Sequence, residues 1–195
     1  MLFRSSLAVL LLGATTIGAA AAPFHHPFGE WREYSRDWLA ACPDKVNEKG
    51  SFYAEFSCFA STYSQERNSA NLPAYSLTVI RNRLTGELDI ALTLADTQRN
   101  FDTTRPLVLR FAGDPPEQLD FTADLETRYN TSNQFFVLDP QRKAELLQRF
   151  KDRSAVELQV PIEGAPKPWT TRLSLRGLNA SLDFMEAYAR RIEQY

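Results

Sequence analysis

The sequence predicts a mainly β protein: an antiparallel β-sandwich with one interior helix and a C-terminal helix packed on the sheet. Short segments of alternating apolar and polar residues, separated by prolines and glycines, recur along the chain and are typical of half-buried strands. The only two cysteines fall on two of these segments, and helical spacing occurs in only two places. Many short strands with such punctuation indicate a sandwich or a closed barrel, and we favour the sandwich.

The first residues, 1–21, have the pattern of a secretory signal peptide. Arg4 supplies a positive charge, an apolar run extends from Leu7 to Leu12, and small-residue cleavage patterns like Ala-x-Ala end at Ala20 or Ala21. The apolar run is too short to span a membrane comfortably, and no second long apolar run follows. We therefore expect an exported protein without an integral membrane segment after signal removal. Its expected location is the periplasm, either free or associated with the envelope.

The next segment, residues 22–36, is predicted to be an N-terminal arm ahead of a single β-rich domain, residues 37–195. His25 and His26 stand between two Pro-Phe pairs in this arm. Adjacent histidines can bind a metal ion weakly, but no further ligands are evident nearby. We therefore expect a mobile arm with no set geometry and no metal site.

The two cysteines, Cys42 and Cys58, are predicted to lie on neighbouring strands joined by a polar loop. The alternating residues are Trp38, Ala40 and Cys42 on one strand, and Phe56, Cys58, Ala60 and Thr62 on the other. A disulfide between them would stabilise the fold by roughly 3 kcal/mol in the chain-entropy model. A zinc site would need about four closely spaced ligands, and a catalytic thiol would need a nearby histidine. The disulfide is the favoured interpretation, and it agrees with export.

The remaining strands follow in order along the chain. The predicted strands are Tyr75–Arg81, Glu87–Leu94, Pro106–Ala112, Gln118–Thr122, Ala123–Tyr129, Asn133–Leu138, Ala155–Ile162 and Trp169–Leu175. Thr85-Gly86 separates the first two and can adopt the positive φ that a tight hairpin needs.

The two predicted helices have different signals. Pro140–Phe150 begins with Asp139 as N-cap and has proline at its first position, which suits a helix start. In the C-terminal segment, apolar residues recur at steps of three and four and form one stripe. Its stripe residues are Leu178, Leu182, Met185, Ala189 and Ile192.

The charge balance limits the classes of partner. The chain has 22 basic and 24 acidic residues, for a net charge of −2. Removing the leader takes away one arginine and no acid, so the net charge of the rest is near minus three. This balance gives no electrostatic reason to expect nucleic acid or an anionic membrane as partner.

The motifs of the common enzyme classes are not found. The sequence has no Gly-x-Ser-x-Gly elbow and no glycine-rich phosphate loop, and histidine occurs only in the arm. Acidic residues lie close together at Asp114, Glu117 and Asp120, and at Asp124 and Glu126. A hydrolase with a carboxylate pair is therefore the least favoured alternative. We expect no catalytic residues, no cofactor and no metal.

Three stretches carry a family resemblance. They are Asp37-Trp38 leading to Cys42, Cys58-Phe59-Ala60, and Trp169 to Leu178 followed by Asn179-Ala180-Ser181. In this order they resemble the invasion-associated locus B family of exported bacterial proteins, or an uncharacterised periplasmic relative. The resemblance implies a periplasmic or envelope-associated β-sandwich without known catalysis.

Two functional hypotheses follow. The first is a non-catalytic interaction module that binds an envelope protein or a glycan through loops, with Arg99, Phe101 and Arg105 as contact residues because an aromatic ring stands among cations in a polar loop. Phe101 would otherwise fill part of the core. The second is a carrier of a small, lipid-like ligand, with a cavity inside the β-rich body. Its lining would come from Leu107, Leu109, Phe111, Phe135 and Val137, although these residues are more naturally core.

Overall fold

The computed structural model describes residues 22–189, so the predicted leader, residues 1–21, lies outside the described residues. In chain order the elements are β1 (Phe24–His26), β2 (Glu30–Ser35), β3 (Trp38–Pro43), the 3-10 helix η1 (Tyr53–Glu55), β4 (Ser57–Tyr63), β5 (Tyr75–Asn82), β6 (Leu88–Leu94), β7 (Leu107–Arg110), β8 (Glu117–Leu119), β9 (Leu125–Thr127), β10 (Gln134–Val137), α1 (Pro140–Asp152), β11 (Ala155–Val160), β12 (Trp169–Ser174) and α2 (Leu178–Ala189).

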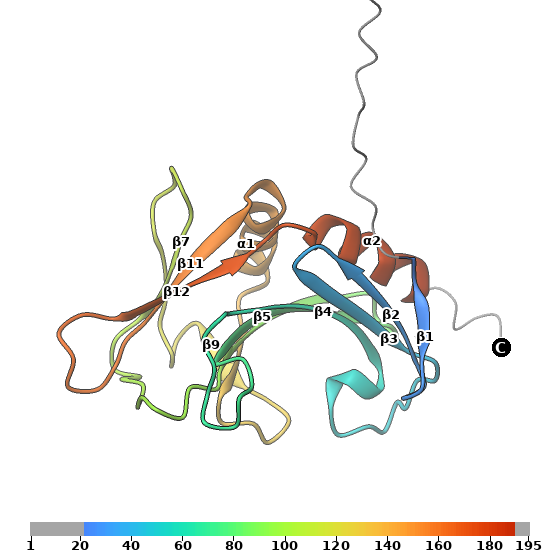
Figure 1. The fold of residues 1–195 in the computed structure, drawn as a ribbon, viewed down its shortest axis with the longest axis horizontal. Coiled ribbons are helices and arrows are strands. Elements are labelled where there is room, and N and C mark those ends of the chain that lie inside the picture. The colour runs from blue at the N-terminus through green and yellow to red at the C-terminus, as the bar shows by residue number, and fades with distance from the viewer. Residues whose placement is uncertain (1–21, 190–195) are drawn as a thin grey trace, which may run out of the picture.

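The strands form two antiparallel sheets, which confirms the predicted fold class. The larger sheet has eight strands in the order β1-β2-β3-β4-β5-β6-β10-β9, and the smaller has four in the order β12-β11-β7-β8. The large sheet is curved, and the small sheet, α1 and α2 all lie on its convex side (Figure 1). Helix α2 packs on β2, β3 and β4, as the apolar stripe of the C-terminal segment predicted.

The main core lies between the two sheets and under the helices. Alternation places Leu77 and Leu92 of the large sheet in the same buried cluster as Leu109 and Leu158 of the small sheet. Trp38 is buried there as well, and its indole N–H donates to the carbonyl of Ser174 in β12 at 3.0 Å. A hydrogen bond thus joins the two sheets inside the apolar core.

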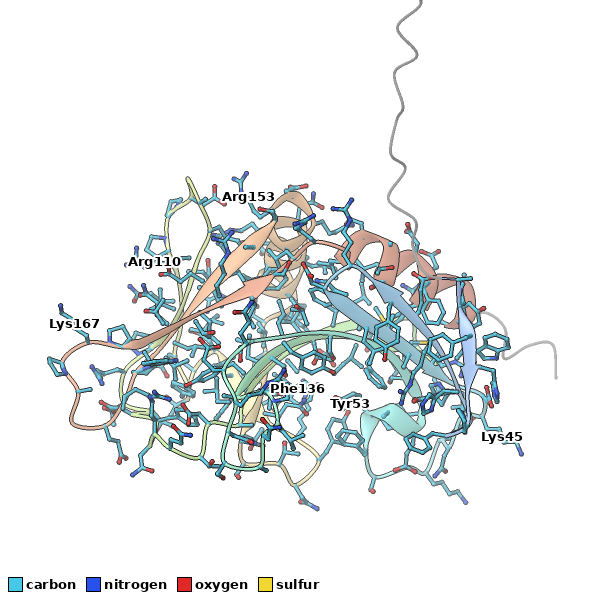
Figure 2. All side chains as sticks on the ribbon, in the orientation of Figure 1. Lys45, Tyr53, Arg110, Phe136, Arg153 and Lys167 are labelled. Atoms are coloured by element: carbon cyan, nitrogen blue, oxygen red, sulfur yellow. A yellow bond between two sulfur atoms is a disulfide. The ribbon has the colours of Figure 1, made fainter. Side chains whose placement is uncertain are left out.

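A second, smaller cluster covers the concave face of the large sheet. It consists of Tyr53, Ile80, Ala91 and Phe136. Figure 2 shows Tyr53 and Phe136 on that side of the sheet, with Tyr53 carried by η1. The rings of Tyr53 and Phe136 meet edge to face with centroids 6.4 Å apart. The loop between β3 and β4 is therefore held by aromatic packing at its middle.

The base of the same loop is held by the predicted disulfide. Cys42 and Cys58 are bonded, and β3 pairs with β4 in the antiparallel register that their alternation requires. This confirms both the pairing and the neighbouring strands. A disulfide is consistent with an oxidising compartment.

The prediction of an arm without set geometry is wrong. Residues 24–26 and 30–35 form β1 and β2, and β2 pairs with β3 over its whole length. The strand pattern of β2 is hard to recognise because Glu33 and Ser35 face inward beside Trp31. The Ser35 hydroxyl donates to the Glu33 carboxylate at 2.7 Å, so these buried polar groups satisfy each other.

The other predicted elements are present with small shifts of their ends. Asp139 caps α1, because its carboxylate accepts from the backbone N–H of Arg142 at 2.7 Å. Gly86 has φ +77° in the turn between β5 and β6, as the hairpin prediction required. The strands β7 to β10 are shorter than predicted. Within residues 22–189, no helix has the length and apolar character needed to cross a membrane.

Candidate functional site

A pocket of about 450 Å³ lies where β1, β2 and the end of β3 meet the last turn of α2. Its lining residues are His25, Trp31, Cys42, Pro43, Asp44, Lys45, Arg83 and Tyr188. The volume lies within the range of small-molecule sites, about 300–1,000 Å³. Figure 2 labels Lys45 at this side of the molecule. The pocket is therefore built partly from the segment that the sequence suggested was an arm.

One wall of the pocket is aromatic. The rings of Trp31 and Tyr188 contact each other with centroids 5.5 Å apart, and Tyr188 stacks on Phe184 at 4.3 Å. The His25 ring meets Trp31 edge to face at 5.4 Å. Pairing of β2 with β3 places Trp31 directly opposite Cys42, so the disulfide continues the same wall. Such a wall favours flat or aliphatic groups.

Arg83 brings a cation to this wall. It stands just after β5, and its Nη1 donates to the carbonyl of Pro43, while Nη2 donates to the carbonyl of Tyr188 at 3.4 Å. Its Nε is buried and has no hydrogen-bond partner among the residues described. Burial lowers the pKa of Arg83, and the nearby Asp44 carboxylate opposes that shift. An arginine nonetheless stays charged in a protein, so this guanidinium is a partly desolvated cation.

The opposite side of the pocket carries a histidine–aspartate pair. His25 Nε2 lies 2.6 Å from Asp44 Oδ2, with the side chains 50% and 32% exposed. The backbone N–H of Asp44 donates to the carbonyl of Gly29 at 2.9 Å, which ties the loop to the β1–β2 turn. Lys45 and Arg83 bring two positive charges to the lining, and Asp44 brings one negative charge. The pocket thus has a net positive charge.

The His–Asp pair has no side-chain nucleophile beside it among the described lining residues. Such a pair can activate a serine, threonine or thiol within reach, or act as a general base on water. Among residues 22–189, the lining contains no serine or threonine, and its one cysteine is in the disulfide. The arrangement combines an aromatic wall with a partly buried cation.

The two histidines do not join a larger ligand cluster. His25 pairs with Asp44, and His26 Nδ1 lies 4.0 Å from Glu30. Within residues 22–189, no group of three or more His, Cys, Asp or Glu side chains is placed to hold a metal ion.

The contact residues predicted from the sequence lie together on the loop between β6 and β7. Arg99 pairs with Asp96 at 2.5 Å and its guanidinium lies 3.7 Å from the centroid of Trp169. Arg105 pairs with Asp102 at 2.7 Å. Phe101 is half-buried, packs against the main core and forms a bridge with Ile162. Each residue thus has a partner within the chain, and a role in binding another molecule stays a prediction.

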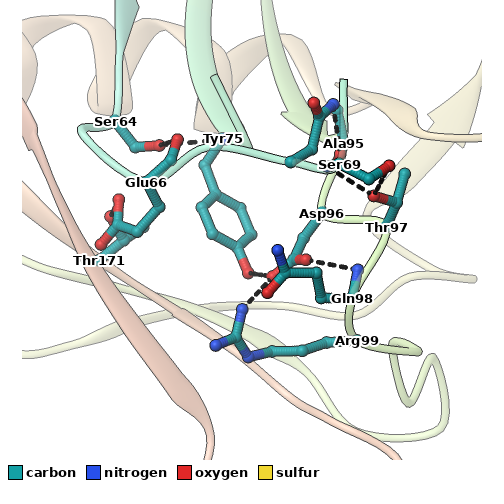
Figure 3. A network of polar contacts seen from close by, with 11 residues as sticks. Ser64, Glu66, Ser69, Tyr75, Ala95, Asp96, Thr97, Gln98, Arg99 and Thr171 are labelled. Carbon is teal, nitrogen blue, oxygen red and sulfur yellow. Dashed lines mark hydrogen bonds and ion pairs between the residues drawn. The ribbon is translucent and has the colours of Figure 1, made fainter. Parts of the chain in front are cut away.

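Asp96 is the centre of a buried polar network around Arg99 (Figure 3). Asp96 is 6% exposed, and its carboxylate accepts from Tyr75 Oη at 2.8 Å and from the Gln98 N–H at 2.8 Å. Burial alone would raise the pKa of Asp96, but these hydrogen bonds and Arg99 outweigh it and hold the pKa below its usual value. Burial and the bond to Asp96 raise the pKa of Tyr75.

Replacing Asp96 with asparagine is expected to make the free energy of unfolding depend less on pH in the acid range. A carboxyl with a depressed pKa in the folded state stabilises the fold above its unfolded pKa, about 3.8, and loses that contribution as pH falls through the folded value. The Asp96→Asn protein should therefore be about 1–3 kcal/mol less stable at neutral pH, and the difference should shrink as the pH falls through the folded pKa. Urea unfolding across this range measures the difference. The exposed Glu163→Gln is the control, and equal acid slopes in all three proteins would contradict the argument.

The residues predicted to line a cavity inside the sandwich fill the core instead. All five are buried in the main cluster: Leu107, Leu109, Phe111, Phe135 and Val137.

The pocket residues that the sequence did not reveal are Trp31, Arg83 and Tyr188. Arg83 and Tyr188 are 105 positions apart, and no local pattern predicts that they meet. His25 was singled out in the sequence as one of two adjacent histidines and Cys42 as a disulfide cysteine, and neither pattern predicts this pocket.

Comparison with known proteins found no matching family model, no matching curated protein and no matching solved structure. The resemblance to the invasion-associated locus B family therefore stays a prediction.

Proposed function

We propose that this protein is a non-catalytic binding protein for a small amphipathic anion, whose apolar part lies against Trp31 and Tyr188 and whose acid group binds Arg83. The observation that carries the proposal is a partly desolvated guanidinium in the wall of an aromatic pocket. This is the small-ligand carrier hypothesis with a different site, at the end of α2 rather than inside the sandwich.

The acid group follows from the hydrogen-bonding capacity of Arg83. A guanidinium has five N–H donors, and the two bonds to Pro43 and Tyr188 use carbonyl oxygens that carry no full charge. Among the described residues, no carboxylate forms an ion pair with Arg83 within 4.0 Å. The nearby Asp44 carboxylate pairs with His25 instead. A ligand carboxylate would give this partly desolvated cation a directly paired counter-charge and further hydrogen-bond acceptors.

The apolar part follows from the remaining lining. The rest of the wall offers few hydrogen-bonding groups. It consists of the ring faces of Trp31, Pro43 and Tyr188, together with Cys42. An alkyl chain or an aromatic ring covers this wall without leaving a polar group unpaired against it. A medium-chain or aromatic carboxylic acid fits both features.

The test compares decanoate with decanol by calorimetric titration. We expect the protein to prefer decanoate by about tenfold or more, because only the carboxylate pairs with Arg83. Arg83→Met should remove the preference and leave decanol binding largely unchanged. Arg81→Met is the matched control, since Arg81 does not line this pocket. Thermal unfolding confirms that each variant is folded. Equal binding of acid and alcohol by the wild type, or an unchanged preference in Arg83→Met, would rule out the proposed role.

The periplasm remains our proposed location. The leader-like pattern of residues 1–21 and the disulfide support it. Fractionation of cells that express the full chain would show it in the periplasmic extract, and recovery in the cytoplasm with two alkylatable thiols would contradict it.

A further inference from the structure

A second hollow, larger and more polar than the first, lies between the edge of β12 and the chain that follows β4. Its volume is about 730 Å³. The lining includes three arginines, Arg67, Arg172 and Arg176, together with hydroxyl groups of four residues. Those hydroxyl residues are Tyr63, Ser64, Ser154 and Ser174. We call this hollow the arginine groove.

The three arginines differ from most of the other arginines among residues 22–189, which form ion pairs. Arg149 and Arg153, at the end of α1, both pair with Asp114. In contrast, Arg67, Arg172 and Arg176 form no ion pair within 4.0 Å among residues 22–189, and all three are exposed. Their charges are therefore available to an anion in solution.

The groove continues into a neighbouring hollow of about 310 Å³. The two share Ser154, Ala155 and Arg172, and the second adds Arg110 and Arg153 together with the acids Asp114 and Glu157. Figure 2 labels Arg110 and Arg153 near the small sheet. Arginines thus occur along an extended surface rather than around a single point, which suits a chain-like ligand with several negative groups.

The acidic residues of the groove indicate what kind of anion fits. The Asp37 carboxylate accepts from the Ser174 hydroxyl at 2.6 Å, and Glu66 accepts from the Thr171 hydroxyl at 2.7 Å. Figure 3 shows Glu66 and Thr171 side by side. A carboxylate has about four lone-pair sites, so both can accept further hydrogen bonds. A ligand that carries hydroxyl donors as well as negative groups would use these acceptors, whereas a polyphosphate would be repelled by them.

We propose that the arginine groove binds an acidic glycan, a saccharide chain with carboxylate groups. The carboxylates pair with Arg67, Arg172 and Arg176, and sugar hydroxyls donate to Asp37 and Glu66. Tyr63 is 44% exposed at the rim and offers a ring face to the apolar side of a sugar. This site shares no lining residue with the pocket at Arg83, so the result of testing one proposal does not decide the other.

The test measures binding of the purified protein to polygalacturonate, to dextran as the neutral glycan, and to inorganic polyphosphate. We expect binding to polygalacturonate that weakens as salt is raised, with little binding to the other two. The double variant Arg172→Gln/Arg176→Gln should weaken polygalacturonate binding by about tenfold or more. Both arginines are exposed, so the variant should stay folded.

Lys167→Gln is the matched control, because it removes an exposed cation on the β11–β12 loop outside the groove (Figure 2). It should leave the affinity unchanged. Equal loss in Lys167→Gln would show an unspecific effect of net charge, and polyphosphate binding as tight as polygalacturonate would show simple anion attraction. Either result, or no binding to polygalacturonate, overturns the proposal.

Discussion

Gly177→Ala is expected to destabilise the fold by about 3–5 kcal/mol, from backbone overlap together with an unfavourable φ. A Cβ at this position would lie 1.9 Å from the carbonyl oxygen of Ser35 and 2.8 Å from its carbonyl carbon. Both are backbone atoms, so no side-chain rotation can relieve the overlap. The φ of Gly177 is +107°, which a residue with a Cβ rarely adopts.

The position of Gly177 explains why the effect should reach the whole fold. It joins β12 to α2, and its neighbour Arg176 accepts a hydrogen bond from the N–H of Asp37 at 3.3 Å. The small sheet, the large sheet and the terminal helix therefore meet at this turn.

Gly86→Ala is the matched control for Gly177→Ala. Gly86 also has a positive φ, +77°, but no atom lies within 4 Å of the position that a Cβ would occupy there. Its loss should be about 1–2 kcal/mol, from backbone strain alone. Urea unfolding of the two variants measures the difference. Equal losses would contradict the close contact between Gly177 and Ser35.

Removing the disulfide is the second change with a large expected effect. Replacing Cys42 and Cys58 with alanine should lower the free energy of unfolding by about 3 kcal/mol. The sequence separation is 16, and both side chains are buried, so the variant loses a constraint on the unfolded chain and some core packing. Urea unfolding, compared with the wild type before and after reduction, measures the loss.

The same variant should also weaken ligand binding at the pocket. Cys42 lines it, and Pro43, Asp44 and Lys45 follow directly at the base of the loop. The middle of the loop is held separately by Tyr53, so we expect reduced affinity rather than complete loss. A double-alanine protein within about 1 kcal/mol of the wild type would show that the disulfide does not act as argued.

Local patterns predicted much of the fold because local physics decides those elements. Asp139 and Pro140 start a helix through a cap and a fixed φ, and Gly86 permits a tight hairpin. The alternation around Cys42 and Cys58 places both on neighbouring strands. These features need no knowledge of distant residues.

The first two strands were not predicted because they form by pairing, β2 with β3 and β1 with β2. Phe24–His26 is short, and the inward positions of β2 include Glu33 and Ser35, which satisfy each other only in the folded sheet. A polar residue at an inward position removes the alternation that identifies a strand.

The pocket could not be predicted for a related reason. Trp31, Arg83 and Tyr188 come from three distant segments, and the packing of α2 on the large sheet brings them together. His25 was visible in the sequence as one of two adjacent histidines, but its partner Asp44 lies 19 positions away. No spacing rule connects these residues, so their common role follows only from tertiary structure.

The most direct test of the central claim is a crystal structure of the protein with a bromine-labelled decanoic acid. Our account predicts the carboxylate within hydrogen-bond distance of Arg83 and the bromine signal beside Trp31 and Tyr188. A bromine signal only in the core, on the arginine groove or elsewhere on the surface, or no bound acid at saturating concentration, would contradict it.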